Sequence, residues 1–185
     1  DPDVRRLFDA TFAILNRQRI LTLLRRGRYG ADGINRFLSR QLRPALDRGS
    51  SGSAFAGLPI LITRNDYNLN LFNGDIGIVT RSLTGDYAAA FMGRDGTYRA
   101  ISPARLPSYE TAYAMTIHKS QGSEFDHVML ILPNREPPVL TRELLYTGIT
   151  RARNSVDIIG SDEIIRITVS RTVARTTGLR GKLWK

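Results

Sequence analysis

The sequence contains no cysteine and only two histidines among its 185 residues. Disulfide bonds and cysteine-ligated zinc are therefore excluded. No apolar run approaches the roughly 20 residues needed to span a bilayer. The first residues, Asp1-Pro2-Asp3, lack the apolar core of a signal peptide. We therefore expect a cytoplasmic protein that has no membrane partner.

The phosphate-binding signature G-x-x-x-x-G-K-[ST] is also missing. The pair Lys119-Ser120 follows a histidine rather than a glycine, and Gly181-Lys182 is followed by a leucine. No apolar strand ends in the Asp-Glu pair that holds magnesium beside such a loop, because Asp162-Glu163 is better explained as the start of a helix. We predict no metal site.

Basic side chains outnumber acidic ones, with 27 Lys and Arg against 17 Asp and Glu, a formal charge of +10 and a pI of about 10.6. This excess favours a polyanion as partner, and nucleic acid is the most common one. The excess lies in residues 1–50 and 111–185, whereas residues 51–110 are balanced. The chain is therefore expected to hold a different module in its middle.

The first fifty residues alternate between helical and strand patterns. Residues 3–16 place apolar side chains at helical spacing, and Arg19–Leu24 is a short apolar run suited to a buried strand. Asp32 is a suitable N-cap for a helix that ends near Arg43. The stretch Gly49–Ser53 predicts an exposed loop.

The middle of the chain has the pattern of a small antiparallel β module. Turn pairs such as Asn73-Gly74 and Asp95-Gly96 supply the positive φ angles that tight hairpins require. These turns separate short strands, which we expect at 58–63, 75–81, 87–92 and 97–101.

The last third returns to alternating strands and helices. The continuous apolar run His127–Leu132 suits a two-sided parallel sheet. Thr141 is expected to cap a helix that runs to about Arg153, Val156–Gly160 to form another buried strand, and Ser161 to open the last helix. The whole pattern describes an α/β domain interrupted by a β module.

The segment Thr116–Phe125 (TIHKSQGSEF) gathers many polar groups beside two apolar strands. Hydroxyl, amide and backbone N–H groups at a strand end can position nucleic-acid phosphates without reading bases. Gly122 lets the backbone approach a ligand closely, and Glu124 can accept a hydrogen bond from a sugar hydroxyl. Taken alone, His118 and His127 are each better explained by a structural role.

The segment Tyr146–Arg153 (YTGITRAR) presents two arginines. On one helix Arg151 and Arg153 lie about 200° apart, so they cannot serve the same face. One arginine directed at a phosphate would stabilise charge in phosphoryl transfer. A surface arginine paired with Glu143 or Glu124 is the alternative, and the residues alone leave both open.

Together these segments resemble a known family. TIHKSQGSEF followed by LLYTGITRAR is similar to motifs V and VI of superfamily-one helicases. The stretch GLPILITRNDYNLNLFNGDIGIV (Gly57–Val79) narrows the resemblance to the RecD-like branch, which includes the exodeoxyribonuclease V alpha subunit. Arg19–Leu42 is similar to the start of the family's second motor domain and Arg175–Leu179 to its C-terminus.

The resemblance implies an α/β fold, a RecA-like motor domain (2A) of the P-loop NTPase type without its own P-loop, over residues 1–64 and 110–185. An SH3-like β barrel (2B) would occupy residues 65–109. ATP and Mg²⁺ would be bound mainly by a separate N-terminal motor domain of the same protein, so this segment alone would be inactive. The family further implies a 5′-to-3′ DNA helicase acting in recombination and repair, in some cases with other subunits of a helicase–nuclease complex.

The resemblance also implies roles for individual residues. Arg151 corresponds to the motif VI arginine that reaches the γ-phosphate of ATP held by the other motor domain. Gly122 and Glu124 fall in the motif V segment that lines the nucleotide. The expected contacts of the single-stranded DNA backbone are Thr116, His118, Ser120 and Gln121, with Arg64 and Asn65 as further candidates at the entrance to the SH3-like module.

A second interpretation remains open at the level of the sequence. The basic flanks and the β module also fit a non-catalytic nucleic-acid-binding or complex-assembly module. The missing P-loop does not separate the two, because a segment of a motor and a degenerate natural protein have the same appearance.

Overall fold

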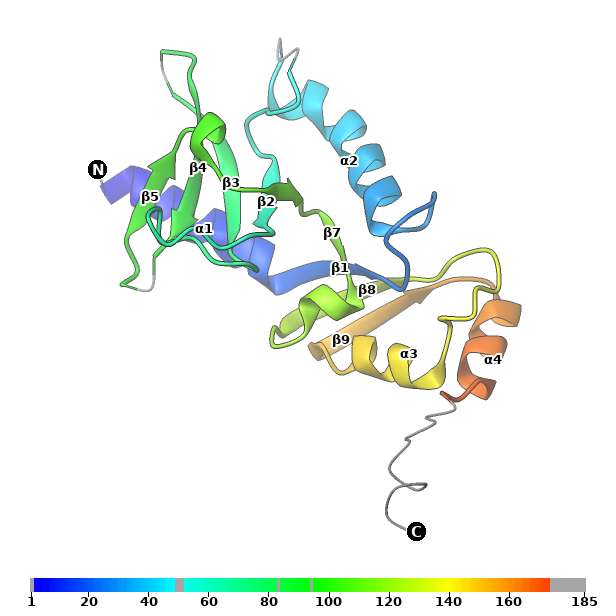
Figure 1. Cartoon of the computed structure of the whole chain (residues 1–185). Helices are drawn as coiled ribbons and strands as arrows, with labels where there is room; N and C mark the ends of the chain where they lie inside the picture. The colour runs from blue at the N-terminus through cyan, green and yellow to red at the C-terminus, as the bar shows by residue number, and fades with distance from the viewer. Residues whose placement is uncertain (1, 49–51, 83, 94, 174–185) are drawn as a thin grey trace, which may run out of the picture.

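The computed structural model describes residues 2–48, 52–82, 84–93 and 95–173, which form two sheets side by side (Figure 1). The first sheet is parallel with strand order β7-β1-β8-β9, and the second is antiparallel with order β5-β4-β3-β2-β6. Residues 49–51 of the expected loop and the expected family C-terminus at 175–179 lie outside the described residues.

The parallel sheet confirms the alternating pattern of the two flanks. Its strands are β1 (Gln18–Thr22), β7 (Ala114–Thr116), β8 (Phe125–Ile131) and β9 (Ala152–Ile159). Leu21 of β1 and Leu130 of β8 are fully buried in its core. The expectation that the last strand is buried was wrong. Among the strands that the structure describes, it is an edge strand that pairs with β8 alone, and most of its side chains are exposed.

Within the described residues, α3 and α4 lie on one side of this sheet and α2 on the other, whereas α1 runs along the second sheet and reaches the parallel sheet only at its C-terminal end (Figure 1). Their bounds are α1 Pro2–Arg17, α2 Ala31–Leu46, α3 Arg142–Ile149 and α4 Asp162–Ser170. The expected caps Thr141 and Ser161 are confirmed, since their hydroxyls accept the N–H of Leu144 and Ile164 at 3.3 Å. Asp32 is not the cap of α2, because the helix begins earlier, after Gly30.

The second sheet confirms the antiparallel pattern of the middle. Its strands are β2 (Pro59–Ile62), β3 (Ile76–Arg81), β4 (Tyr87–Met92), β5 (Tyr98–Ile101) and β6 (Tyr109–Thr111), and a 3₁₀ turn, η1 (Pro103–Arg105), connects the last two. A separate core around Phe55, Leu71 and Phe91 stabilises it. None of its strands pairs with the parallel sheet within the described residues.

The strand pairing disagrees with the boundary that the sequence predicted between the two parts of the chain. The expected boundary after residue 64 leaves β2 with the first part, whereas β2 pairs with β3 and β6 in the second sheet. The second sheet therefore extends from Pro59 to Thr111. Its edge strands β5 and β6 do not pair with each other in the described residues, so the pairing does not show a closed barrel.

Side chains from α1 and α2 join the two sheets. Phe8 of α1 stacks on Tyr98 of β5 with ring centroids 5.1 Å apart, and the Tyr98 hydroxyl donates to Asp9. Asp47, at the C-terminal end of α2, accepts hydrogen bonds from Arg81 and Tyr87 of the second sheet. The Tyr87 hydroxyl, the Ala56 backbone N–H and Arg81 hold the pKa of Asp47 below its ordinary value.

Candidate nucleotide and nucleic-acid interface

The TIHKSQGSEF segment forms a compact loop where β7 ends. After Thr116 the chain enters a 3₁₀ turn, η2 (Ile117–Ser120), which the Ser120 hydroxyl closes by donating to the Ile117 carbonyl at 2.8 Å. Gly122 follows with φ at +86°, and a Cβ added to it would meet no other atom within 4 Å. Such positive φ angles favour glycine. We call Thr116–Glu124 the motif V loop.

The loop exposes only part of the set expected to contact DNA. His118 and Gln121 are exposed, Thr116 is half-buried, and Ser120 is fully buried. Because the Ser120 hydroxyl also donates to the Ile117 carbonyl, the Ser120 side chain is not available to DNA in this structure. Ser120 holds the turn together instead.

His118 and Gln121 line a groove beside α3. The rest of its lining comes from α3 and its cap, from the residues before it and from the segment after α4: Pro138, Val139, Thr141, Glu143, Leu144, Thr147 and residues 171–173. We call it the α3 groove. Hydrogen bonds from its own backbone N–H and from that of Val173 hold the pKa of Glu143 below its ordinary value.

Arg151 lies in the turn between α3 and β9, and not on a helix as expected. Its Nε donates to the Thr147 carbonyl at 3.3 Å and its Nη1 to the Ser123 carbonyl at 3.2 Å. The Arg151 carbonyl accepts from the N–H of Phe125, which begins strand pairing at this point and so ends the helix at Ile149. The arginine is thereby brought to the motif V loop.

The charge of Arg151 is not neutralised by any carboxylate of the described residues. Its three side-chain hydrogen bonds reach two carbonyls and the Thr150 hydroxyl, all of them neutral. By contrast, Arg153 in β9 pairs with Glu124, its Nε 3.1 Å from a carboxylate oxygen. The surface pair considered from the sequence thus exists, but with Arg153 in place of Arg151.

Gly148 explains how closely α3 approaches the motif V loop. It is buried in α3, and a Cβ there would lie 2.8 Å from side-chain carbons of Ile117 and of Leu130. Any larger residue would require the Ile117 and Leu130 side chains to shift or α3 to move away from them. This glycine stands inside YTGITRAR, but no pattern in the sequence marks it as a packing contact.

Arg64 and Asn65 lie elsewhere, in the loop between β2 and β3. The Asn65 side-chain oxygen accepts the N–H of Asn73 at 2.8 Å, so this side chain organises its own loop. Arg64 is exposed. No hydrogen bond or ion pair between described residues links either of them to the motif V loop, so the structure does not bring these two candidates to the others.

Glu110 connects the motif V loop to the loop before α2, a contact that sequence reasoning missed. Its carboxylate accepts Lys119 Nζ at 2.5 Å and lies 3.7 Å from Arg25 Nη2. Nearby, Asn35 of α2 donates to the carbonyls of Thr111 and Ala114, and its side-chain oxygen accepts the Ala114 N–H. Only the tertiary structure reveals these pairs.

The chain is similar to one known family model and to several known proteins. Residues 111–159 match the model of the UvrD-like helicase C-terminal domain. The RecBCD enzyme subunit RecD of Mycolicibacterium smegmatis is 43% identical over 171 residues, which is 92% of this chain and 30% of that protein. The ATP-dependent RecD2 DNA helicase of Deinococcus radiodurans is 35% identical over 163 residues, 86% of this chain and 22% of that protein. The chain belongs to the RecD-like helicases.

The RecD-like chain also resembles solved helicases in fold. The Pif1 helicase from Bacteroides, in complex with ADP-AlF3 and ssDNA, matches 82% of this chain and 44% of its own with a TM-score of 0.50 and 17% identity. This likeness supports the mixed α/β fold with a parallel sheet of helicase motor domains. Within the described residues no helix is long and apolar enough to cross a membrane. The chain spans 30% of the length of the mycobacterial RecD.

Proposed function

We propose that this chain is the C-terminal motor part of an ATP-dependent DNA helicase that acts in recombination and repair. In this proposal the parallel sheet and its helices are domain 2A, and the second sheet is an SH3-like module, 2B. An N-terminal motor domain of the same protein would hold ATP and Mg²⁺, and no magnesium ligand is assigned to this chain. The mycobacterial relative is named as a subunit of the RecBCD enzyme, so we propose further subunits as partners of this chain.

The environment of Arg151 is the observation on which the proposal rests. The Arg151 guanidinium is partly exposed and its hydrogen bonds reach only neutral oxygens, so its positive charge is available to an anion. Hydrogen bonds to two carbonyls fix its direction before the ligand arrives, which suits a group that must stabilise charge on a transferring phosphoryl group. Arg151 would therefore contact the γ-phosphate across the cleft between the two motor domains.

Gly122 and Glu124 fit the nucleotide beside this arginine. They flank Ser123, whose carbonyl holds Arg151. The open space around Gly122 admits a ligand close to the backbone. The Glu124 side chain is 56% exposed despite its pair with Arg153, so it can accept a hydrogen bond from a ribose hydroxyl.

The α3 groove supports single-stranded DNA binding. His118 and Gln121 offer an imidazole and an amide in its lining, and Thr141 and Thr147 offer hydroxyls. Such groups bind phosphates and sugars without reading base sequence, as a translocating motor requires. His118 and Gln121, with Thr116 at the edge, therefore remain the proposed DNA contacts, whereas Ser120 has a structural role.

The test is steady-state ATPase kinetics of the full-length protein, that is, this chain with whatever further segments its gene encodes. Arg151→Ala should lower the DNA-stimulated kcat by about 10³-fold. Arg151→Lys should not restore it, because an ammonium lacks the planar fork of the guanidinium. Arg166→Ala on α4, which removes an exposed arginine, is the matched control and should behave like the wild type.

Two outcomes would reject the proposal. Near-normal kcat in a folded Arg151→Ala variant would remove the arginine from catalysis. Absence of any DNA-stimulated ATPase in the full-length wild type would favour the non-catalytic nucleic-acid-binding or complex-assembly module. The proposed 5′-to-3′ direction is tested separately, by comparing the unwinding of duplexes that have a 5′ or a 3′ single-stranded tail.

A further inference from the structure

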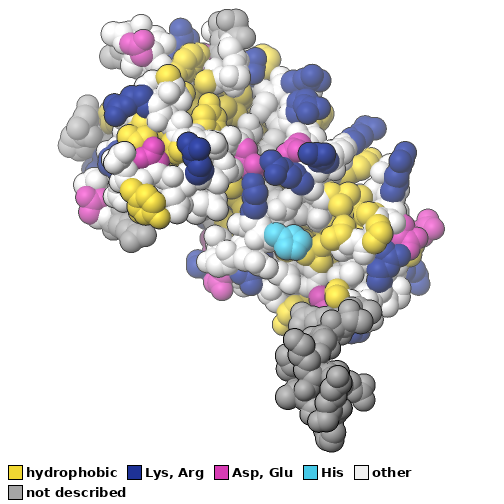
Figure 2. All heavy atoms as spheres, in the orientation of Figure 1, with side chains coloured by type: hydrophobic (Ala, Val, Ile, Leu, Met, Phe, Trp, Pro, Cys, Tyr) yellow, Lys and Arg dark blue, Asp and Glu magenta, His cyan; other side chains and the backbone are white. Residues whose placement is uncertain are grey.

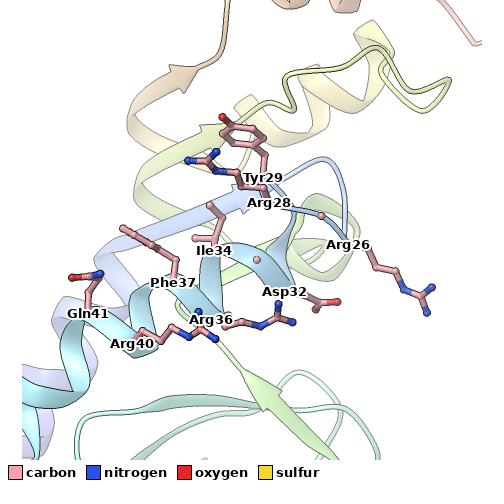
Figure 3. A pocket seen from close by; sticks show the side chains of 11 residues that line it. Arg26, Arg28, Tyr29, Asp32, Ile34, Arg36, Phe37, Arg40 and Gln41 are labelled. Carbon is pink, nitrogen blue, oxygen red and sulfur yellow. The ribbon is translucent and has the colours of Figure 1, made fainter.

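Helix α2 presents a stripe of three arginines on one side. Arg36, Arg40 and Arg43 follow the spacing i, i+4, i+7, which keeps them within roughly 60° around the helix and spreads them over about 10 Å along its axis. Figure 3 shows Arg36 and Arg40 extending from the same side of α2. On the face drawn in Figure 2, Lys and Arg side chains gather over the region of α2.

This stripe is not neutralised by the part of the chain that the structure describes. Other arginines there reach carboxylates, as Arg81 does with Asp47 and Arg153 with Glu124. None of the three stripe arginines forms an ion pair with a described carboxylate. Like charges at this spacing cost a helix a few tenths of a kcal/mol per pair, roughly 0.2–0.5. An uncompensated stripe therefore indicates an anion from outside the segment.

The stripe lines a groove between α2 and β6, which we call the α2 groove. Its walls are Asp32, Asn35, Arg36, Ser39, Arg40, Arg43, Pro44, Ser53, Glu110 and Thr111. Arg43 is held in place by Phe55, with its guanidinium carbon 5.2 Å from the ring centroid, and its Nε is buried without a hydrogen-bond partner. Arginines together with hydroxyls are the groups that bind phosphate and sugar oxygens.

The α2 groove lies next to the motif V loop. Glu110, at its end, bonds Lys119 of that loop, and Arg25 lies near the same carboxylate, so its negative charge is compensated. Asn35 in the groove wall is bonded to Ala114 at the start of β7, the strand that leads into the motif V loop. Because the α2 groove adjoins the motif V loop, one DNA strand can contact both.

A second hollow, which Arg36 and Arg40 also line, favours nucleic acid over an acidic protein surface. It is lined by Arg26, Arg28, Tyr29 and Phe37, among others (Figure 3), and Phe37 is 57% exposed. Exposed aromatic rings beside basic side chains provide the stacking surfaces on which single-stranded bases bind.

We propose that the α2 groove binds the sugar–phosphate backbone of single-stranded DNA and extends the path that begins at the motif V loop. Arg36, Arg40 and Arg43 contact successive phosphates, and bases are directed towards Phe37. This inference rests on the proposed helicase function, because it continues a DNA path that the function requires.

The experiment measures binding of a labelled oligo-dT to the full-length protein over a series of salt concentrations. Each phosphate contact on a single strand contributes about 0.7 to the slope of log K against log salt. Arg36→Ala/Arg40→Ala should therefore lower the slope by up to about 1.4, while Arg36→Lys/Arg40→Lys should keep it. Arg166→Ala on α4 is the control and should match the wild type.

The oligonucleotide length gives a second readout. Wild-type affinity should rise until the strand spans both the motif V loop and the α2 groove, and should level off at a shorter length in the double alanine variant. A wild-type slope and length profile in that variant, with His118→Ala/Gln121→Ala weakening binding, would reject the α2 groove alone. Wild-type protein whose binding to oligo-dT is absent or independent of salt would reject the proposed function itself.

Discussion

Replacement of Asn35 by alanine should measure how strongly α2 is fixed to the strand that leads into the motif V loop. The Asn35 side chain is 8% exposed and makes three hydrogen bonds. Its Nδ2 donates to the carbonyls of Thr111 and Ala114 at 2.8 and 2.9 Å, and its Oδ1 accepts the Ala114 N–H at 2.8 Å. Alanine removes all three bonds.

The expected loss of stability follows from these bonds. A buried donor or acceptor left without a partner costs about 1–3 kcal/mol, and the adjacent α2 groove lets water replace part of the loss. We therefore take the lower end, about 1 kcal/mol per bond, and subtract about 0.6 kcal/mol for the better helix propensity of alanine. Asn35→Ala should destabilise the chain by roughly 2–3 kcal/mol, equal to a fall in Tm of about 4–12 °C.

Denaturant unfolding and thermal melts of the wild type and variant check this value. Gln41→Ala, which changes an exposed amide on the same helix, should stay within about 0.5 kcal/mol of the wild type. Asn35→Asp keeps the shape but turns a carboxylate towards two carbonyls, so it should be less stable than Asn35→Ala. A loss below about 1 kcal/mol, or an aspartate variant as stable as the wild type, would refute the reasoning.

Gly148→Ala should gain about 1 kcal/mol of helix propensity but lose about 1–3 kcal/mol by overpacking against Ile117, so a melt should show no stabilisation; a clear rise in Tm would contradict the close contact. Because the pKa of Asp47 is lowered in the folded state, its carboxylate stabilises the protein above the unfolded pKa of about 4, and this contribution is lost as the pH falls through the folded pKa. The stability advantage of the wild type over Asp47→Asn should therefore shrink on acidification, and a constant difference from pH 7 to pH 3 would exclude this role.

Local patterns in the sequence predicted most elements because they depend on neighbouring residues. Thr141 and Ser161 each cap the N–H three residues ahead, a contact within one turn. Gly85 and Gly96 likewise adopt positive φ angles in the hairpin turns β3–β4 and β4–β5, whereas Gly74 lies in the long loop between β2 and β3. The end of α3 was predicted too late, because Arg151 leaves the helix only through its pairing with Phe125 of another strand.

Contacts between distant segments could not be predicted. Arg19 sits in an apolar run, yet it is buried and donates to the Ala112 carbonyl, 93 residues away. Burial lowers its pKa to about 10. Asn35 bonds residues 76 and 79 positions along the chain. The periodicity of apolar residues does not indicate such pairs, so the polar side chains that fix the site could not be identified from the sequence.

The short motif V loop links the two proposed ligands through its backbone. His118 and Gln121 face the α3 groove, whereas Ser123, two residues on, holds the guanidinium of Arg151 by its carbonyl. The Ser120 hydroxyl closes the turn between them, so this part of the loop is a compact unit rather than a flexible connection. A shift of the loop on binding DNA would therefore change the position of the Ser123 carbonyl, and with it the arginine that the proposal assigns to the γ-phosphate.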